Sequence, residues 1–199
     1  MLLAQGLDLD DPIIARIVAF GDLVLRYNKM ANLISEGDEA KIASRHLLDS
    51  LQPLRIPSLI PEPGSKWADL GSGAGFPVFP LCIAKPEIQF YAVEPRLKRS
   101  TFLKMAQHEI GITNLIVLES NAESAGLAEL DRVSCRALGS AKQDWARAEP
   151  ILKSSGVFIT LKSLRDCSLL PPNLWTISPY ELPGETQPYC VTSRIKVHG

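Results

Sequence analysis

Three glycines alternate along a loop that joins a short apolar segment to a predicted helix. The loop spans residues 69–77 and reads Asp-Leu-Gly-Ser-Gly-Ala-Gly-Phe-Pro. Glycine lets a chain turn sharply and lets its amides approach a ligand that a Cβ would block. The dinucleotide-binding fingerprint spaces its glycines as GxGxxG, whereas Gly71, Gly73 and Gly75 follow GxGxG. The loop therefore predicts a ligand-binding strand–loop–helix unit. NAD is an alternative ligand, and the GxGxG spacing argues against it.

The segments around and after the loop alternate between strand-like and helical patterns. Strands are predicted at residues 66–70, 88–94, 115–118, 131–136 and 156–162, and helices from the loop to residue 84, at 97–110 and at 141–152. Such alternation predicts parallel strands joined by right-handed crossovers, with helices on both faces. Strand-like segments at 175–182 and 189–197 predict an antiparallel hairpin at the sheet edge. We expect an α/β, Rossmann-like fold with the seven-stranded, mostly parallel sheet of class I methyltransferases.

The first 64 residues follow a different pattern. Apolar residues recur at helical spacing over residues 12–27, and a second helix is predicted at 39–51. Prolines at 53, 57, 61 and 63, followed by a glycine, then interrupt regular structure. We therefore divide the chain into an N-terminal helical extension, 1–64, and a Rossmann-like domain, 65–199.

The charge balance and the cysteines limit the class of protein. The chain has 21 Lys and Arg against 22 Asp and Glu, so any nucleic-acid surface must be a local patch. Its four cysteines form no CxxC pair and no cluster with metal-ligand spacing, so we expect reduced thiols and no metal. We find neither a signal peptide nor an apolar run near the roughly 20 residues that a membrane helix requires. These features predict a soluble, cytoplasmic protein, which we expect to be a monomer.

Acidic residues end the first two predicted strands. Asp69 precedes Gly71 by two residues, where a carboxylate can orient the ammonium group of a ligand or hold the loop itself. Glu94 ends the second strand, where an acid can accept hydrogen bonds from both ribose hydroxyls. The structural alternatives are loop bracing for Asp69 and a solvated strand end for Glu94. Together with the glycine loop, the two acids favour a nucleoside ligand.

A third polar segment, Asn121-Ala122-Glu123, follows the third predicted strand. In this fold the loop at that position faces an adenine, whose edge the amides of Ala122 and Glu123 can bind. The alternative is a helix N-cap at Asn121, with Glu123 in the first turn favoured by the helix dipole. Spacing alone favours the N-cap.

Motifs along nearly the whole chain carry a family resemblance. They lie at residues 32–35, 45–50, 69–77, 98–99, 102–103, 122–123, 136–137 and 161–162. The most specific are Arg-His-Leu-Leu-Asp-Ser at 45–50 and the Gly-Phe-Pro end of the glycine loop. On these motifs the chain resembles the ribosomal RNA small-subunit methyltransferase G family, also called glucose-inhibited division protein B.

The resemblance implies transfer of a methyl group from S-adenosylmethionine to N7 of a guanine in 16S rRNA of the small ribosomal subunit. It implies cofactor contacts from Gly71, Phe76, Ala122, Glu123 and Arg136, to which the loop argument adds Asp69, Gly73, Gly75 and Glu94. It also suggests that the extension carrying Arg45 and His46 frames the RNA or the site. Several residues depart from the family pattern: Tyr27 replaces a common tryptophan, Val78-Phe79 replaces Gly-Ile, Asn121 replaces a common arginine, and Ser163 replaces a glycine.

Two basic residues at strand ends are the predicted catalytic residues. Guanine N7 carries an exposed lone pair, so alignment of donor and acceptor matters more than a strong general base. Arg136 and Lys162 end predicted strands, where this fold places its site. We expect Arg136 to contact guanine O6 or a phosphate, and Lys162 to bind a phosphate. A surface salt bridge is the structural alternative for both.

Other charged residues have weaker patterns. Arg45 and Asp49 are four apart and are expected to pair on one helical face. A basic patch at Arg96, Lys98, Arg99 and Lys104 can bind phosphates or form a solvated helix face.

Two alternatives to the ribosomal assignment stay open. One is methylation of a small molecule, and the other is a non-catalytic, cofactor-binding RNA or assembly factor. The residues at 121 and 163 keep the second alternative open, and the accepted substrate would distinguish all three.

Overall fold

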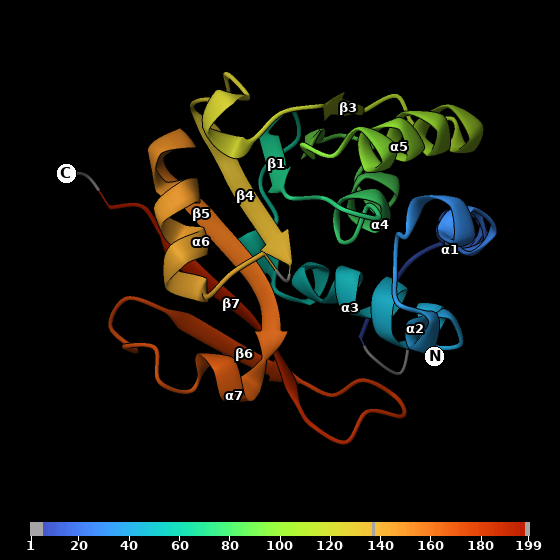
Figure 1. The fold of residues 1–199 in the computed structure, drawn as a ribbon. Coiled ribbons are helices and arrows are strands. Elements are labelled where there is room, and N and C mark those ends of the chain that lie inside the picture. Colours follow the sequence, from blue (N-terminus) through green and yellow to red (C-terminus); the bar gives the residue numbers. More distant parts are fainter. Residues whose placement is uncertain (1–5, 137, 198–199) are drawn as a thin grey trace.

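A single seven-stranded sheet forms the centre of the molecule in the computed structural model, which describes residues 6–136 and 138–197 (Figure 1). The strands are β1 (Lys66–Leu70), β2 (Gln89–Val93), β3 (Leu115–Leu118), β4 (Leu130–Arg136), β5 (Leu152–Ser163), β6 (Thr176–Tyr180) and β7 (Tyr189–Ile195). Their order is β3-β2-β1-β4-β5-β7-β6, with β1 to β5 parallel and β7 antiparallel to both β5 and β6. The predicted fold class is confirmed.

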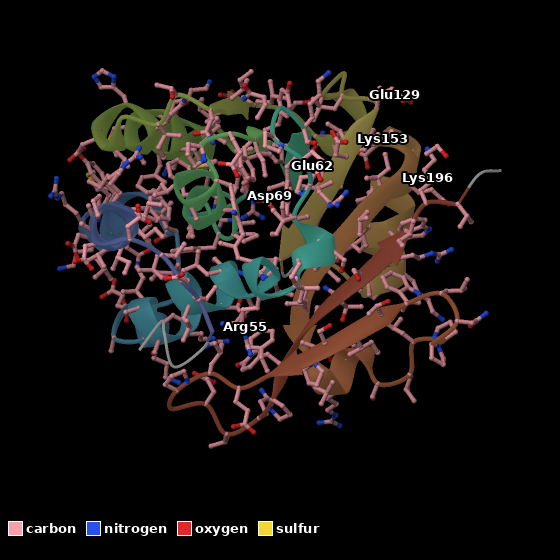
Figure 2. All side chains as sticks on the ribbon, turned by 180° about the vertical axis from the view of Figure 1, so that it is seen from behind. Arg55, Glu62, Asp69, Glu129, Lys153 and Lys196 are labelled. Carbon is pink, nitrogen blue, oxygen red and sulfur yellow. The ribbon has the colours of Figure 1, made fainter. Side chains whose placement is uncertain are left out.

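The strand order reverses between β1 and β4, which lie side by side although two strands separate them in the sequence. Chain connections leave this point toward opposite edges of the sheet, so a crevice opens at the carboxyl ends of β1 and β4. At the other end of these strands, Lys153 forms an ion pair with Asp131, and Lys196 Nζ donates to the carbonyl of Leu152 at 2.5 Å. Lys153 and Lys196 are labelled at that outer edge in Figure 2, away from Asp69.

Helices cover both faces of the sheet (Figure 1). The α-helices are α1 (Asp11–Ala31), α2 (Glu36–Glu39), α3 (Leu48–Leu51), α4 (Val78–Ala84), α5 (Leu97–Ile110), α6 (Ala141–Ala148) and α7 (Leu164–Cys167). A π-helical turn, η2 (Ile42–Leu47), precedes α3, and 3₁₀ turns lie at η3 (Gln52–Arg55), η4 (Pro57–Leu59), η5 (Ala122–Ser124) and η6 (Glu149–Ile151). Helices α1, α3, α4 and α5 share one core on one face, and α6 and α7 contribute to a second core on the other.

The N-terminal extension packs into the core of the sheet domain. Phe20 of α1 is fully buried and stacks on Phe79 of α4, with ring centroids 4.4 Å apart. The same core includes Trp67 of β1 and Phe90 of β2. Burial of one such side chain contributes roughly 1.5–3 kcal/mol, so α1 stabilises the face that it covers. The division of the chain at residue 64 stays a prediction.

The predicted helix at 39–51 is wrong in detail. Helix α2 ends at Glu39, and the chain continues through η2 into α3. Arg45 lies in the π-helical turn η2, whereas Asp49 lies in the following helix α3. Arg45 Nη1 bonds Asp38 Oδ1 at 2.5 Å, and Asp49 instead bonds Arg136 of β4. The expected Arg45–Asp49 pair is therefore wrong.

Candidate functional site

The glycine loop lies at the carboxyl end of β1, at the crevice. Gly71 and Gly73 have φ values of +69° and +56°, in the region that favours glycine. A Cβ on Gly71 would lie 2.8 Å from Cδ1 of Leu138, across the crevice. Gly75 has a different environment, because its Cβ would lie 2.7 Å from Phe79 and 2.8 Å from Phe20. Gly71 therefore faces the crevice, while Gly75 lets the loop pack against α1 and α4.

Glu94 at the end of β2 braces the glycine loop. Its Oε2 accepts a hydrogen bond from the Gly73 amide at 2.8 Å, and Oε1 accepts one from the Arg96 amide at 2.9 Å. The residue is only 3% exposed, yet it lines the crevice beside Gly73. The predicted solvated strand end is wrong. Because each carboxylate oxygen can accept more than one hydrogen bond, Glu94 can brace the loop and still bind a ribose.

Asp69 is fully buried at the start of the loop and is labelled in Figure 2. Its Oδ1 accepts a hydrogen bond from Ser134 Oγ of β4 at 2.8 Å, and its backbone carbonyl accepts one from Ser72 Oγ at 2.9 Å. These bonds tie β1, β4 and the loop together. They favour loop bracing, and a contact between Asp69 and the ligand's ammonium stays a prediction.

Burial raises the pKa of Asp69 from 3.8 to about 7, against the opposing effect of its serine hydrogen bonds and of Arg136. Between these two values the folded state holds a proton that the unfolded state has released, so stability falls as the pH rises, by at most about 1.4 kcal/mol per pH unit. An Asp69→Asn variant should lose this dependence and become more stable relative to the wild type between pH 5 and pH 7. Urea unfolding at several pH values measures it; parallel pH profiles for the two proteins would contradict this account.

A cleft extends from the glycine loop across the ends of β1, β2 and β3. It consists of two adjoining cavities of about 390 and 250 Å³, which share Gly71, Pro95 and Leu138. We call it the loop cleft. Its lining includes most of the predicted cofactor residues: Gly71, Gly73, Phe76, Glu94, Ala122, Glu123 and Arg136. These residues come from the ends of four neighbouring strands, and the fold brings them together around one cleft.

The loop cleft suits an adenosyl cofactor by its chemistry. Gly71 presents backbone without a side chain, and Glu94 offers carboxylate oxygens for ribose hydroxyls at the end of β2. Ala122 and Glu123 line the other end, on the short turn η5. Asn121 occupies the predicted N-cap position of this turn, in extended conformation, but its side chain makes no capping hydrogen bond. The exposed Asn121 instead lines the cleft.

A second, larger cavity of about 780 Å³ adjoins the loop cleft. We call it the wide pocket. It is lined by residues of the extension and by the ends of β4, β5 and β7, including Asp38, Arg45, Asp49, Lys162, Ser163 and Tyr189. His46, Arg136 and Leu138 line both the wide pocket and the loop cleft. These three residues therefore form the wall where ligands in the two cavities would meet.

Arg136 is held on three sides at this wall. Its Nη1 bonds Asp49 Oδ2 at 3.0 Å, and its Nη2 lies 2.7 Å from His46 Nδ1. The guanidinium also lies over the ring of Phe76, 5.1 Å from the centroid. Tyr180 of β6 donates its hydroxyl hydrogen to the other Asp49 oxygen. The Arg136 side chain is 16% exposed, so a partly buried, paired cation forms here rather than a surface salt bridge.

Lys162 has its own partners. Its Nζ donates to the carbonyl of Gly139 at 2.5 Å and lies 3.1 Å from Oδ2 of the fully buried Asp144. The lysine lines the wide pocket, but its side chain is only 8% exposed. These contacts favour a structural role, in which Lys162 holds the turn between β4 and α6 in place. A catalytic or phosphate-binding role for Lys162 stays a prediction.

Sequence reasoning missed two members of the cluster around Arg136. Asp49 lies in the specific motif at 45–50, so the sequence marks its segment as characteristic of the family. It does not indicate that Asp49 bonds Arg136, 87 residues away. Tyr180 lies in the C-terminal hairpin and had no local signal. Ser163, a departure from the family pattern, caps α7 through a bond from the Asp166 amide to its Oγ at 3.2 Å. Ala137, which completes one family motif, lies outside the described residues.

Two kinds of feature are absent from residues 6–136 and 138–197. In that part of the chain, no helix has both the length and the apolar character needed to cross a membrane. The same residues contain no group of three or more His, Cys, Asp or Glu side chains arranged to hold a metal ion.

Several solved structures with the same fold are methyltransferases. An S-adenosylmethionine-dependent methyltransferase from Aquifex aeolicus aligns with a TM-score of 0.58 and 13% identity, covering 82% of this chain and 100% of that one. A precorrin-6y C5,15-methyltransferase from Geobacter metallireducens aligns with a TM-score of 0.57 and 15% identity, covering 81% and 89%. At these identities the likeness shows the fold alone.

Sequence relatives define the family. A ribosomal RNA small subunit methyltransferase G from Azoarcus sp. is 32% identical over 188 residues, covering 91% of this chain and 86% of that protein. A protein of the same name from Helicobacter hepaticus is 36% identical over 149 residues, covering 73% and 78%. The family profile described as rRNA small subunit methyltransferase G matches residues 13–168. The chain therefore belongs to the rRNA small subunit methyltransferase G family.

Proposed function

We propose that this protein transfers a methyl group from S-adenosylmethionine to N7 of a guanine in 16S rRNA of the small ribosomal subunit. Family membership supplies the reaction class and the RNA substrate. One observation carries the proposal to the residues: His46, Arg136 and Leu138 form a common wall between the loop cleft and the wide pocket. A cofactor in the cleft and a base in the pocket would meet at this wall.

The loop cleft is the proposed cofactor site. S-adenosylmethionine, when bound, supplies a methyl group already activated by its sulfonium. Glu94 would hold the ribose hydroxyls, the amides of Ala122 and Glu123 would bind the adenine edge, and the backbone of Gly71 and Gly73 would border the remainder. These residues lie on one continuous cleft.

The wide pocket is the proposed guanine site. Because N7 attacks with its own lone pair, the site needs alignment rather than a strong general base. Burial and the neighbouring Arg136 lower the pKa of His46 to about 4, so this imidazole is neutral near pH 7. Arg136 is paired with Asp49, which limits repulsion between the guanidinium and the positive charge that develops on the methylated guanine.

The basic patch near α5 is the proposed path for the RNA backbone. Arg96 and Arg99 line the loop cleft, and Lys98 is exposed. Lys104 lies 3.5 Å from Glu119 and is partly neutralised. Phosphates bound by Arg96, Lys98 and Arg99 would place an RNA strand beside the cleft.

We further propose that the protein acts in the cytoplasm as a monomer.

Replacing Glu94 tests the cofactor site. In a Glu94→Gln variant, one carboxylate oxygen becomes an amide nitrogen that faces a backbone N–H, at either Gly73 or Arg96. Loss of the charged acceptor should weaken S-adenosylmethionine binding by about 10- to 100-fold. Isothermal titration calorimetry measures the affinity. Glu119→Gln is the matched control, because Glu119 binds Ser100 instead; equal affinities for the two variants would contradict the assignment.

The substrate class is tested by offering three acceptors with labelled S-adenosylmethionine. Small ribosomal subunits that lack the modification, naked 16S rRNA and a small-molecule extract are compared by counting label in each fraction. We expect label in the subunits or the rRNA. Label confined to small molecules would replace the proposal with a metabolite methyltransferase. Cofactor binding without transfer to any of the three acceptors would favour a non-catalytic factor.

A further inference from the structure

His46 lies at the centre of the wall between the two cavities. It belongs to the turn η2, is 7% exposed, and stacks on Phe76 with ring centroids 5.1 Å apart. It lines both the loop cleft and the wide pocket. The ring is therefore held by packing on one face, while its edge is directed by hydrogen bonds.

Arg136 determines which ring nitrogen of His46 carries the proton. Its Nη2 lies 2.7 Å from His46 Nδ1, and a guanidinium can only donate hydrogen bonds. Nδ1 must therefore accept with its lone pair. In a neutral imidazole the hydrogen then lies on Nε2, which becomes an obligatory donor.

This Nε2–H group has no acceptor within hydrogen-bond distance in residues 6–136 and 138–197. Among the residues that the structure describes, buried His46 Nε2 makes no hydrogen bond. The nearest acid, Asp38, has its Oδ2 3.7 Å away, too far for a hydrogen bond. Asp38 also accepts from Arg45 at 2.5 Å and from Ser35 at 2.7 Å. A buried donor of fixed orientation without an acceptor can be satisfied by a ligand, but Nε2 is itself buried in this structure, so a ligand reaches it only after neighbouring side chains move aside.

We propose that His46 is a specificity-determining residue, whose Nε2–H donates to O6 of the target guanine in the wide pocket. The inference rests on the proposed function. On the edge that carries N7, guanine also presents the acceptor O6, whereas adenine presents the N6 amino donor. A donor at this position therefore selects guanine over adenine. A bond to O6 also leaves the N7 lone pair free to take the methyl group.

Two substitutions separate the donor from the rest of the ring. An Asn side chain in His46→Asn can present its amide oxygen to Arg136 in place of Nδ1, but it is too short to place a donor where Nε2 lies. A Gln side chain in His46→Gln reaches farther and can place its amide N–H near the Nε2 position. The pair is similar in polarity and differs in the donor.

The experiment measures kcat/KM on subunits reconstituted with guanine or with 2-aminopurine at the target nucleotide. 2-Aminopurine keeps N7 and the 2-amino group but lacks O6. The wild type should prefer guanine by about 10- to 100-fold, the range expected for one good base contact. His46→Asn should lose most of this preference, through a lower kcat/KM on guanine, and His46→Gln should retain part of it. Intrinsic differences in N7 reactivity cancel when the ratios are compared between proteins.

Each result has one interpretation. An unchanged guanine preference in His46→Asn overturns the inference, and a simultaneous loss of S-adenosylmethionine affinity would assign the Nε2 donor to the cofactor instead. Circular dichroism identifies a variant that does not fold. If His46→Asn does not fold, His46→Gln decides, because equal kcat/KM values of this variant on guanine and on 2-aminopurine would contradict a donor role. Absence of methylation by the wild type on guanine subunits would overturn the proposed function, not the role of His46 alone.

Discussion

An Arg136→Ala variant is expected to lose methyl transfer, with kcat/KM on small ribosomal subunits reduced by about 10²-fold or more. The guanidinium joins Asp49, His46 and the ring of Phe76 at the wall between the two cavities. Its removal releases the His46 ring edge and empties the position next to the proposed guanine site. Arg136→Lys should also be impaired, since an ammonium cannot reproduce two bonds in fixed, planar directions.

Loss of activity must be separated from loss of folding. Arg136→Ala leaves Asp49 buried with only the Tyr180 hydroxyl as a partner, which is expected to cost about 3–5 kcal/mol of stability. Adding Asp49→Asn removes the unpaired charge and should restore much of the stability, but not the activity. Arg26→Ala is the matched surface control, because Arg26 and Glu109 form an exposed pair. Wild-type kcat/KM in Arg136→Ala would rule out the proposed role.

A Gly75→Ala variant should show a large loss of stability. Gly75 has φ +92°, and a Cβ there would lie within 3 Å of both Phe20 and Phe79. Backbone strain and overpacking each cost roughly 1–3 kcal/mol, so the free energy of unfolding should fall by about 2–6 kcal/mol. Urea denaturation measures this loss.

Gly64→Ala controls for backbone strain. Gly64 has a similar φ of +83°, but no atom lies within 4 Å of a Cβ built on it. Only the strain should appear there, about 1–2 kcal/mol. Equal losses in both variants would mean that the loop repacks around the added methyl group, and that α1 and α4 do not constrain it.

The sheet could be predicted because its signals are local. Apolar strands and intervening helices follow short sequence patterns, and β1 agrees with its predicted span, residues 66–70. Element ends were harder. The helix predicted to reach residue 152 ends at Ala148, two residues before Pro150, which has no N–H to extend the helical hydrogen bonds.

The candidate site was predictable where one residue at a strand end was enough. Gly71, Glu94 and Arg136 were found this way because parallel strands bring their carboxyl ends to one edge. The pairings were not predictable. Asp49 bonds Arg136, 87 residues away, rather than Arg45, and Tyr180 joins them through a hairpin distant in sequence. Such contacts depend on tertiary packing, which no local pattern encodes.

The most direct test of the proposed reaction is the identity of the methylated nucleoside. Small subunits lacking the modification are incubated with the protein and S-adenosylmethionine, and their 16S rRNA is digested and analysed by mass spectrometry. We predict 7-methylguanosine with the wild type and none with Arg136→Ala. A different methylated nucleoside, or none despite measured cofactor binding, would contradict the account.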